Sequence, residues 1–215
     1  MNNYIAVLDR QHLENTIFLT SFARSLAQQK TRKGIILHGD SEYTDRLIQT
    51  GMMREDAEIR AIRDLNRRLI GLFADQGVSA IGLNGYQKGL IRKVENELIF
   101  DKKGYRELPE TPFLLLSNLI ENDQGEPLKI DLPELTRFLV KELKEHDPVI
   151  FSMSEKDELM GSGIKDLNIS DLSEDQITEM IPPEFRNYPS NFYLLSPSGF
   201  GQWPDIRKGS IIRNN

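Results

Sequence analysis

Residues 77–91 read Gly77-Val78-Ser79-Ala80-Ile81-Gly82-Leu83-Asn84-Gly85-Tyr86-Gln87-Lys88-Gly89-Leu90-Ile91, and this stretch indicates the fold. Residues 78–83 favour a strand, and the Asn84-Gly85 pair that follows suits backbone conformations with positive φ. We therefore predict a central strand that ends in a tight loop. In open α/β sheets, ligands bind at such carboxyl ends of strands.

A second stretch of the same kind lies nearer to the amino terminus. Residues 33–37 predict a strand that leads into His38-Gly39-Asp40-Ser41, and an amphipathic segment follows. Two strand-end loops in one chain predict two walls of a single cleft.

The composition fits one soluble domain. A chain of 215 residues is long enough to bury a substantial core in a single α/β domain. The net charge of −6 disfavours sequence-independent binding of nucleic acid, which needs a concentrated basic surface. The absence of cysteine excludes disulfides, thiol nucleophiles and cysteine-ligated metals. The apolar runs are too short for a signal peptide or a membrane span, so we expect a cytoplasmic protein without membrane contacts.

Strands and helices are expected to alternate along the chain. The expected strands cover residues 4–8, 35–37, 78–83, 113–117, 149–153 and 191–195, with a hairpin at 90–101 and an edge strand at 209–212. The expected helices cover residues 14–29, 42–49, 55–75, 132–145 and 173–180. This alternation predicts a largely parallel sheet covered by helices on both faces, a three-layer α/β/α sandwich.

Some local features are also expected. Residues 9–12 read as a polar link, and residues 157–172 read as a polar loop. Asp40 or Ser41 is expected to cap the helix at 42–49. In the helix at 14–29, the residues expected to face the sheet are Ile17, Phe18, Phe22 and Leu26.

Three stretches of the chain match motifs of one known family. Residues 35–41 are similar to a strand that ends in His-Gly-Gly-Gly. Residues 66–91 are similar to a helix, strand and loop in which the loop reads Gly-Leu-Ser-Gly-x-Asp-Gly. Residues 208–212 are similar to a closing Gly-Thr-x-Ile strand. Together they resemble the amino acid kinase family, and among its members most closely the acetylglutamate kinases.

The resemblance implies one α/β/α domain over residues 1–215. In the family, the amino-terminal half, here residues 1–120, binds an acylated amino acid, and the other half, here residues 121–215, binds ATP with Mg. The γ-phosphoryl group is transferred to a carboxylate, a reaction that depends on positioning and charge neutralisation. Because these enzymes are commonly oligomers, the resemblance also implies a homo-oligomer, for which the helix at 14–29 is a candidate interface.

The chain departs from the family where the phosphoryl group binds. The family's Lys-x-Gly-Gly-Ser strand is matched by Val7-Leu8-Asp9-Arg10-Gln11, so valine replaces the lysine that contacts the phosphoryl group. Asp40 and Ser41 replace glycines, and Asp40 adds a negative charge that repels a phosphate. The family's Asn-x-Asn-Ala-Asp run is matched by Lys129-Ile130-Asp131-Leu132-Pro133, and one loop aspartate is matched by Gln87.

The matching positions supply the candidate site residues. The candidates for substrate binding are Gly39, Asp40, Ser41, Arg54, Asn84 and Gly85. The candidates for nucleotide binding, as replacement cations, are Arg10, Lys88, Lys156 and Lys165. Each type has an ordinary structural alternative, because glycine forms turns, Asp and Ser cap helices, and exposed basic side chains are solvated. No catalytic residue and no metal ligand is assigned.

Three hypotheses follow. The first is a protein that keeps the fold and a small-molecule site but lacks phosphoryl transfer, and so acts as a ligand-binding or regulatory homologue. The second is an active kinase that uses ATP and Mg to phosphorylate the carboxylate of an acylated amino acid. The third is a structural or interaction subunit. The coordinated loss of the lysine, the glycines and the Asn/Asp run favours the first hypothesis.

Overall fold

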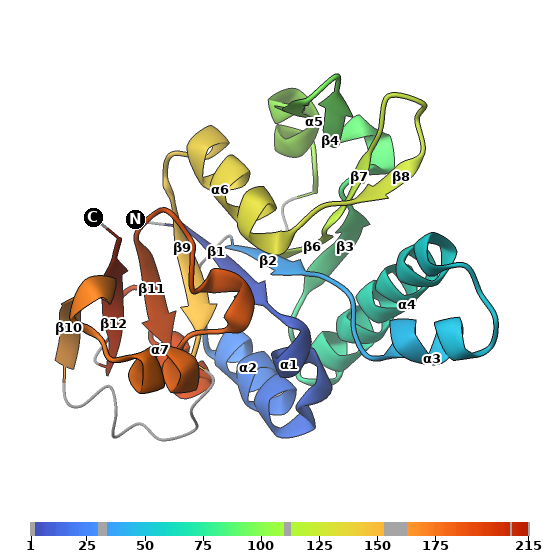
Figure 1. Ribbon diagram of the computed structural model, residues 1–215. Helices are drawn as coiled ribbons and strands as arrows, with labels where there is room; N and C mark the ends of the chain where they lie inside the picture. The colour runs from blue at the N-terminus through green and yellow to red at the C-terminus, as the bar shows by residue number, and fades with distance from the viewer. Residues whose placement is uncertain (1–2, 30–33, 110–112, 153–162, 207, 215) are drawn as a thin grey trace.

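The computed structural model of this protein describes residues 3–29, 34–109, 113–152, 163–206 and 208–214. Its centre is an eight-stranded sheet in the order β10-β12-β11-β9-β1-β2-β6-β3 (Figure 1). All neighbouring pairs are parallel except β11 and β12. The strands are β1 (Asn3–Leu8), β2 (Gly34–His38), β3 (Ala80–Asn84), β6 (Phe113–Ser117), β9 (His146–Phe151), β10 (Gly163–Asn168), β11 (Phe192–Leu195) and β12 (Lys208–Arg213).

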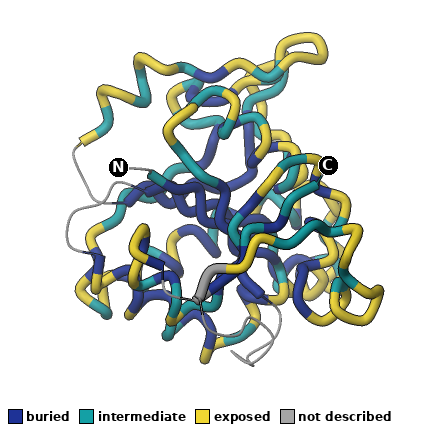
Figure 2. Tube along the Cα trace, turned by 90° about the vertical axis from the view of Figure 1, so that its left-hand side faces the viewer, coloured by how far each residue is buried: buried dark blue, intermediate teal, exposed yellow. Residues whose placement is uncertain are grey.

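Successive residues of β1 serve two different cores. Ile5 and Val7 belong to one buried cluster, and Tyr4, Ala6 and Leu8 belong to another on the opposite face. This alternation follows from the two-residue period of a strand, and both faces are apolar because both are covered. Figure 2 shows the buried trace concentrated in the strands at the middle of the molecule.

Helices form the two outer layers. On one face, the buried cluster includes side chains from α2 (Thr16–Gln28), α4 (Arg54–Asp75) and α8 (Pro197–Phe200). On the other face, it includes side chains from α6 (Leu132–Glu142) and α7 (Glu174–Met180). The predicted three-layer α/β/α sandwich is therefore confirmed.

A second, smaller sheet lies beyond the carboxyl ends of β3 and β6. It has four strands in the order β5-β4-β7-β8, namely β4 (Ile91–Val94), β5 (Glu97–Phe100), β7 (Leu119–Glu121) and β8 (Pro127–Lys129). The predicted hairpin at residues 90–101 is the antiparallel pair of β4 and β5. Lys129, at the end of β8, lies beside the loop that follows β2, where the candidate site is found.

Short helices complete the structure: α1 (Arg10–Glu14), α3 (Tyr43–Gln49) and α5 (Lys102–Arg106), with 3-10 turns at η1 (Gln87–Gly89), η3 (Ile169–Asp171) and η4 (Pro183–Phe185). Residues 9–12, predicted to be a polar link, instead begin α1: Asp9 is its N-cap, with its carboxylate accepting a hydrogen bond from the His12 amide at 2.9 Å, and residues 10–12 lie in the helix. The cap predicted for the helix at 42–49 is borne out in part: the N-cap position is Glu42, which makes no side-chain cap hydrogen bond, but the Ser41 hydroxyl accepts a hydrogen bond from the Tyr43 amide, the first of α3. Among the described helices, none is long and apolar enough to cross a membrane.

The order of the strands differs from the prediction in two places. β3 lies at the edge of the main sheet rather than at its centre, because β6 is inserted between β2 and β3. β12, predicted to be an edge strand, lies between β10 and β11. β10 itself occupies part of the segment that was predicted to be a loop at 157–172, of which residues 157–162 lie outside the described residues.

One residue of the predicted apolar stripe of α2 is misplaced. The side chain of Ile17 is 76% exposed, whereas Phe18, Phe22 and Leu26 are buried. The buried residues are spaced by four, and Ile17 precedes Phe18 by one residue, which turns it away from the sheet.

Candidate functional site

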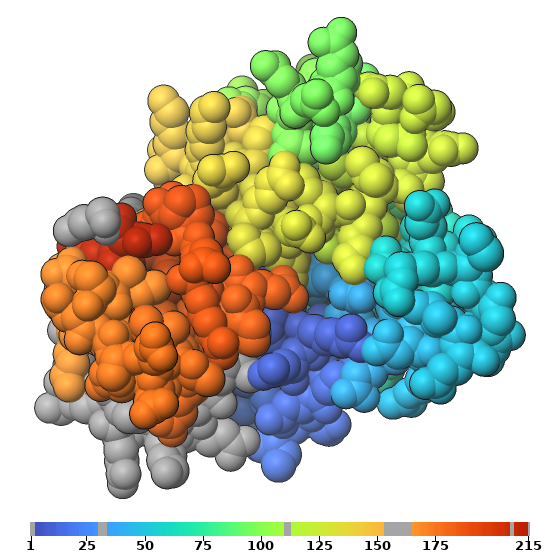
Figure 3. Space-filling view, in the orientation of Figure 1, coloured from blue at the N-terminus to red at the C-terminus, as the bar shows by residue number. Residues whose placement is uncertain are grey.

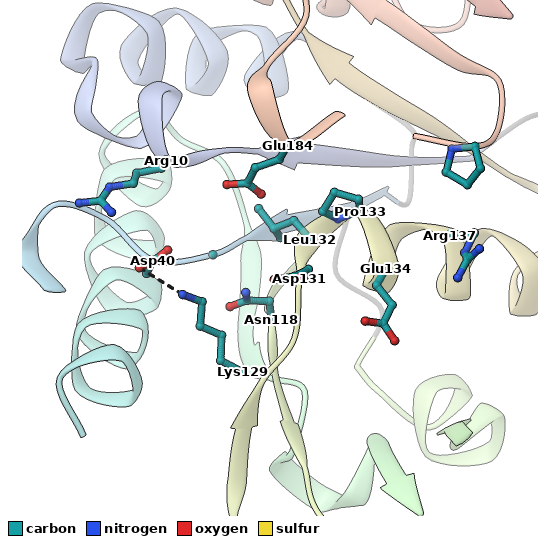
Figure 4. A pocket seen from close by; sticks show the side chains of 12 residues that line it. Arg10, Asp40, Asn118, Lys129, Asp131, Leu132, Pro133, Glu134, Arg137 and Glu184 are labelled. Carbon is teal, nitrogen blue, oxygen red and sulfur yellow. Dashed lines mark ion pairs between the residues drawn. The ribbon is translucent and has the colours of Figure 1, made fainter. Parts of the chain in front are cut away.

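A cavity of about 620 Å³ opens at the carboxyl ends of β1 and β2 and beside the start of α6 (Figure 4). Its wall combines residues from the amino-terminal, middle and carboxyl-terminal parts of the chain, which meet on the face shown in Figure 3. We call it the acidic cavity, after four lining carboxyl residues, Asp40, Asp131, Glu134 and Glu184.

Lys129 is the most buried of the cations that line the acidic cavity. Its ammonium Nζ lies 3.4 Å from an Asp40 carboxylate oxygen (Figure 4) and 3.1 Å from a carboxylate oxygen of Glu58 on α4. Burial alone lowers the pKa of Lys129, but the two carboxylates outweigh this effect and raise its pKa above the ordinary value. Lys129 therefore stays charged, and that charge is already neutralised by the protein.

Glu184 faces the acidic cavity from η4. Although the residue as a whole is exposed, partial desolvation of its carboxyl group raises its pKa to about 7, with a further contribution from the carboxylates of Asp9, Asp40 and Asp131, against the opposing effect of Lys129. Glu184 thus changes its charge near neutral pH. The field in this cavity is unfavourable to a further negative charge.

Asn118 contributes an unused hydrogen-bond acceptor to the same wall. Its side-chain nitrogen donates to the Ile130 carbonyl at 2.6 Å, which fixes the orientation of the amide group. Its side-chain oxygen is buried and has no hydrogen-bond partner in the described part of the chain. A buried acceptor without a partner is costly, so this wall is suited to a ligand that carries an N–H or O–H donor.

The residues that stand where the family has its phosphoryl-binding strand have structural roles. Val7 is 1% exposed and packs in the core below α6. Asp9 caps α1, and the guanidinium of Arg10 pairs with the Asp45 carboxylate of α3. Neither a lysine nor a glycine loop is present here to hold a phosphate.

A buried histidine connects the floor of this region to α4. His38 is completely buried, and burial lowers its pKa to about 4, against a raising effect of its hydrogen bond to Gly39. Its Nδ1 lies 3.0 Å from the Gly39 carbonyl oxygen, which can only accept, so Nδ1 carries the proton. Its Nε2 then accepts from the Asn66 side-chain nitrogen at 2.9 Å. These bonds hold the loop after β2 in place.

The predicted substrate-binding residues lie in different places. Gly39 and Asp40 line the acidic cavity, and Asn84 lines a smaller second cavity next to α4. The prediction that the two strand-end loops form one cleft is therefore wrong for the described residues. Ser41 is buried in the turn before α3, and its hydroxyl accepts a hydrogen bond from the Tyr43 amide at 3.3 Å.

The two remaining substrate-binding candidates line neither cavity. Arg54 is exposed at the first residue of α4. A Cβ atom at Gly85 would lie 2.7 Å from the Leu119 carbonyl oxygen, so packing against the backbone already requires glycine there.

The three predicted nucleotide-binding residues that the structure describes, Arg10, Lys88 and Lys165, do not come together. Arg10 lines the acidic cavity, whereas Lys88 is exposed in η1 with a φ of 60°. Lys165 is exposed on the edge strand β10, and Lys156 lies outside the described residues. Within the described ranges, no group of three or more His, Cys, Asp or Glu side chains is arranged to hold a metal ion.

Sequence reasoning did not select Asn118, Lys129 or Glu184. Lys129 was noted as a departure from a family motif, which was the available signal for this position. Glu184 has no local signal, because it follows two prolines in an irregular segment and reaches the cavity only through the folding of distant strands.

Solved structures with the same fold are members of the amino acid kinase family. Aspartate kinase from Synechocystis superposes with a TM-score of 0.66 at 14% identity, over 100% of this chain and 40% of that chain. N-acetylglutamate synthase from Neisseria gonorrhoeae gives a TM-score of 0.66 at 12% identity, over 100% of this chain and 60% of that chain. An isopentenyl phosphate kinase gives a TM-score of 0.63 at 13% identity, over 99% of this chain and 100% of that chain.

These likenesses confirm the amino acid kinase fold that the sequence motifs predicted. The chain spans less than two thirds of the length of the aspartate kinase and synthase chains, and the full length of the isopentenyl phosphate kinase chain. No protein-family model matches the sequence, and no curated protein matches it. At these identities the comparisons define the fold, and activity has to be argued from the site.

Proposed function

We propose that this protein has an amino acid kinase fold without phosphoryl transfer, and that its acidic cavity binds a small molecule carrying an ammonium group. The observation that carries this proposal is the charge of the cavity. Its four carboxyl residues face three basic ones, of which Arg10 and Lys129 are already paired with carboxylates. Among the described residues, the third base, Arg137, forms no ion pair.

A nucleotide triphosphate fits this arrangement poorly. Its charge would need free cations and close backbone approach, and the residues in those positions are Val7, Asp9 and Asp40. Two like charges at about 4 Å repel by about 1 kcal/mol even in water, and by more in a cleft. An ammonium group would instead find the carboxylates of the cavity and the unused acceptor of Asn118.

The test compares ligands that differ in this one group. Thermal shift and calorimetry with free amino acids, their N-acetylated counterparts and ATP with Mg would measure binding, and a coupled assay would measure ATP turnover. We expect binding of at least one free amine, weaker binding of its acetylated form, and turnover at background. Clear ATP turnover, or preference for the acetylated form such as acetylglutamate, would instead support the active kinase.

The charge of Glu184 gives a pH-dependent prediction for the same ligands. The affinity for an amine should fall as the pH decreases through about 7, because Glu184 becomes protonated and the cavity loses a negative charge. Glu184→Gln should lower the affinity above pH 7 by about fivefold, equivalent to about 1 kcal/mol, and should flatten the pH profile. The matched control is Glu179→Gln, an exposed position on α7 that leaves the cavity unchanged.

Glu184→Gln should also change how the free energy of unfolding depends on pH. The pKa of Glu184 is raised, whereas that of a salt-bridged carboxylate is lowered, so the pH dependence has the opposite sign. The folded protein holds the Glu184 proton more tightly than the unfolded chain, so this group costs stability as the pH rises from the ordinary pKa of 4.5 to about 7. Relative to the wild type, Glu184→Gln should therefore be more stable at higher pH, and the difference should vanish below the ordinary pKa. A difference in Tm that does not change with pH would contradict the assigned pKa.

A further inference from the structure

A second cavity, separate from the acidic one, lies between α4 and the loop that follows β3. It measures about 380 Å³ and is lined by side chains that include Arg63, Asn66, Arg67, Asn84, Tyr86 and Gln87. We call it the arginine pocket. In contrast to the acidic cavity, none of the described residues that line it carries a carboxylate. Its volume is at the lower end of the range for small-molecule sites.

Arg63 is held in a fixed position in this pocket. Its Nε donates to the Tyr86 hydroxyl at 2.9 Å, and its guanidinium carbon lies 5.2 Å from the centroid of the Tyr86 ring. These contacts leave the two terminal nitrogens of the guanidinium as donors. Within the described part of the chain, Arg63 forms no ion pair, whereas the nearby Asp64 pairs with Arg60 and Arg67.

The amide groups of the pocket are also oriented. The Gln87 side-chain oxygen accepts from the Asn84 backbone nitrogen at 2.7 Å and from its side-chain nitrogen at 3.3 Å. The Gln87 oxygen is thus used within the loop, and its NH₂ group remains available as a donor. On the α4 side, Asn66 is fixed by its bonds to His38 and to the Leu83 carbonyl.

The result is a preformed pocket rich in donors and positive charge. A guanidinium presents parallel N–H groups that match the oxygens of a carboxylate or phosphate, and such charge-assisted hydrogen bonds are among the stronger ones. The arrangement costs little reorganisation on binding, because Tyr86 and Asn84 already hold Arg63 and Gln87. We propose that the arginine pocket binds the oxyanion group of a small molecule, a phosphate or a carboxylate, independently of the acidic cavity.

The test titrates the full chain with inorganic phosphate and, separately, with the dicarboxylate succinate. Calorimetry measures affinity, and backbone amide NMR shifts locate the site. We expect at least one anion to shift the amides of Asn84 and Gln87 and to leave those of Asn118 and Lys129 unchanged. The two anions distinguish a phosphate site from a carboxylate site.

Variants of α4 provide the decisive comparison. Arg63→Gln should weaken binding by about tenfold or more, because it removes the fixed cation of the pocket. Arg68→Gln is the matched control, since it removes the same charge from an exposed position of the same helix outside the pocket. Arg67→Gln, at a largely exposed lining position, should have an intermediate effect and serves if Arg63→Gln does not fold.

Three outcomes would overturn the proposal. The first is that neither anion binds at millimolar concentration. The second is that Arg63→Gln and Arg68→Gln weaken binding equally, which would indicate a diffuse attraction to a basic helix. The third is that the anion shifts residues of the acidic cavity instead. None of these outcomes depends on whether the acidic cavity binds an amine, so the two proposals can fail separately.

Discussion

Replacing Phe22 by alanine is expected to lower the free energy of unfolding by about 3–5 kcal/mol, the usual cost of removing a buried aromatic ring. Phe22 is completely buried at the centre of an aromatic cluster between α2 and the sheet. Its ring centroid lies 5.2 Å from that of Phe151, 5.6 Å from that of Phe200 and 6.0 Å from that of Phe73. The cavity left by alanine cannot close easily, because these rings are fixed by three different elements.

Chemical denaturation measures this effect, with Ile17→Ala as the control on the same helix. Ile17 is 76% exposed, so its truncation should change stability by no more than about 0.5 kcal/mol. The midpoint of the Phe22→Ala transition should fall while its slope stays constant. Equal effects of the two substitutions would mean that α2 does not pack on the sheet through this cluster.

Replacing Asn66 by leucine is expected to cost about 1–3 kcal/mol, because it leaves the Nε2 of His38 buried without a donor. The Leu83 carbonyl loses a donor at the same time. Leucine has a volume similar to that of asparagine, so the loss of stability would come from the missing hydrogen bonds and not from a cavity. The exposed Gln49→Leu on α3 is the control for the change from amide to apolar side chain.

The protonation of His38 offers an independent measurement. Nitrogen NMR of the imidazole should show the proton on Nδ1 in the wild type, and no protonation of the ring until the pH falls to about 4. A wild-type ring protonated on Nε2 would contradict the assigned network. A stability change no larger than that of Gln49→Leu would show that the network contributes nothing.

Most strands and helices could be predicted from the sequence because their signals are local. The run from Tyr4 to Leu8 is continuously apolar, and α4 has an apolar stripe that runs from Ala57 to Phe73. The order of the strands could not be predicted in this way, because it depends on distant parts of the chain. For example, β1 lies between β2 and β9, which are far apart in the sequence. Nothing in residues 78–83 reports that β6 separates β3 from β2. The position of β3 at the edge was therefore missed.

The candidate site could likewise be predicted only where its signal is local. The motif at residues 38–41 placed Gly39 and Asp40 at a strand end, and the structure places both in the acidic cavity. Glu184 reaches that cavity from another part of the fold, and its raised pKa depends on neighbours that the sequence does not bring together. The same holds for Arg63, whose hydrogen bond to Tyr86 and place beside Gln87 in the arginine pocket depend on how α4 packs on β3.

The place of β12 has a consequence for how the chain is made. β12 pairs with β11 on one side and β10 on the other, and β10 has no second strand neighbour in the described part of the sheet. The ribosome delivers residues 163–195 before residues 208–213, so β10 must wait as an unpaired segment until the later residues emerge. This end of the sheet is therefore completed only once residues 208–213 are available, and a stall before residue 208 would leave β10 open to pairing with other chains.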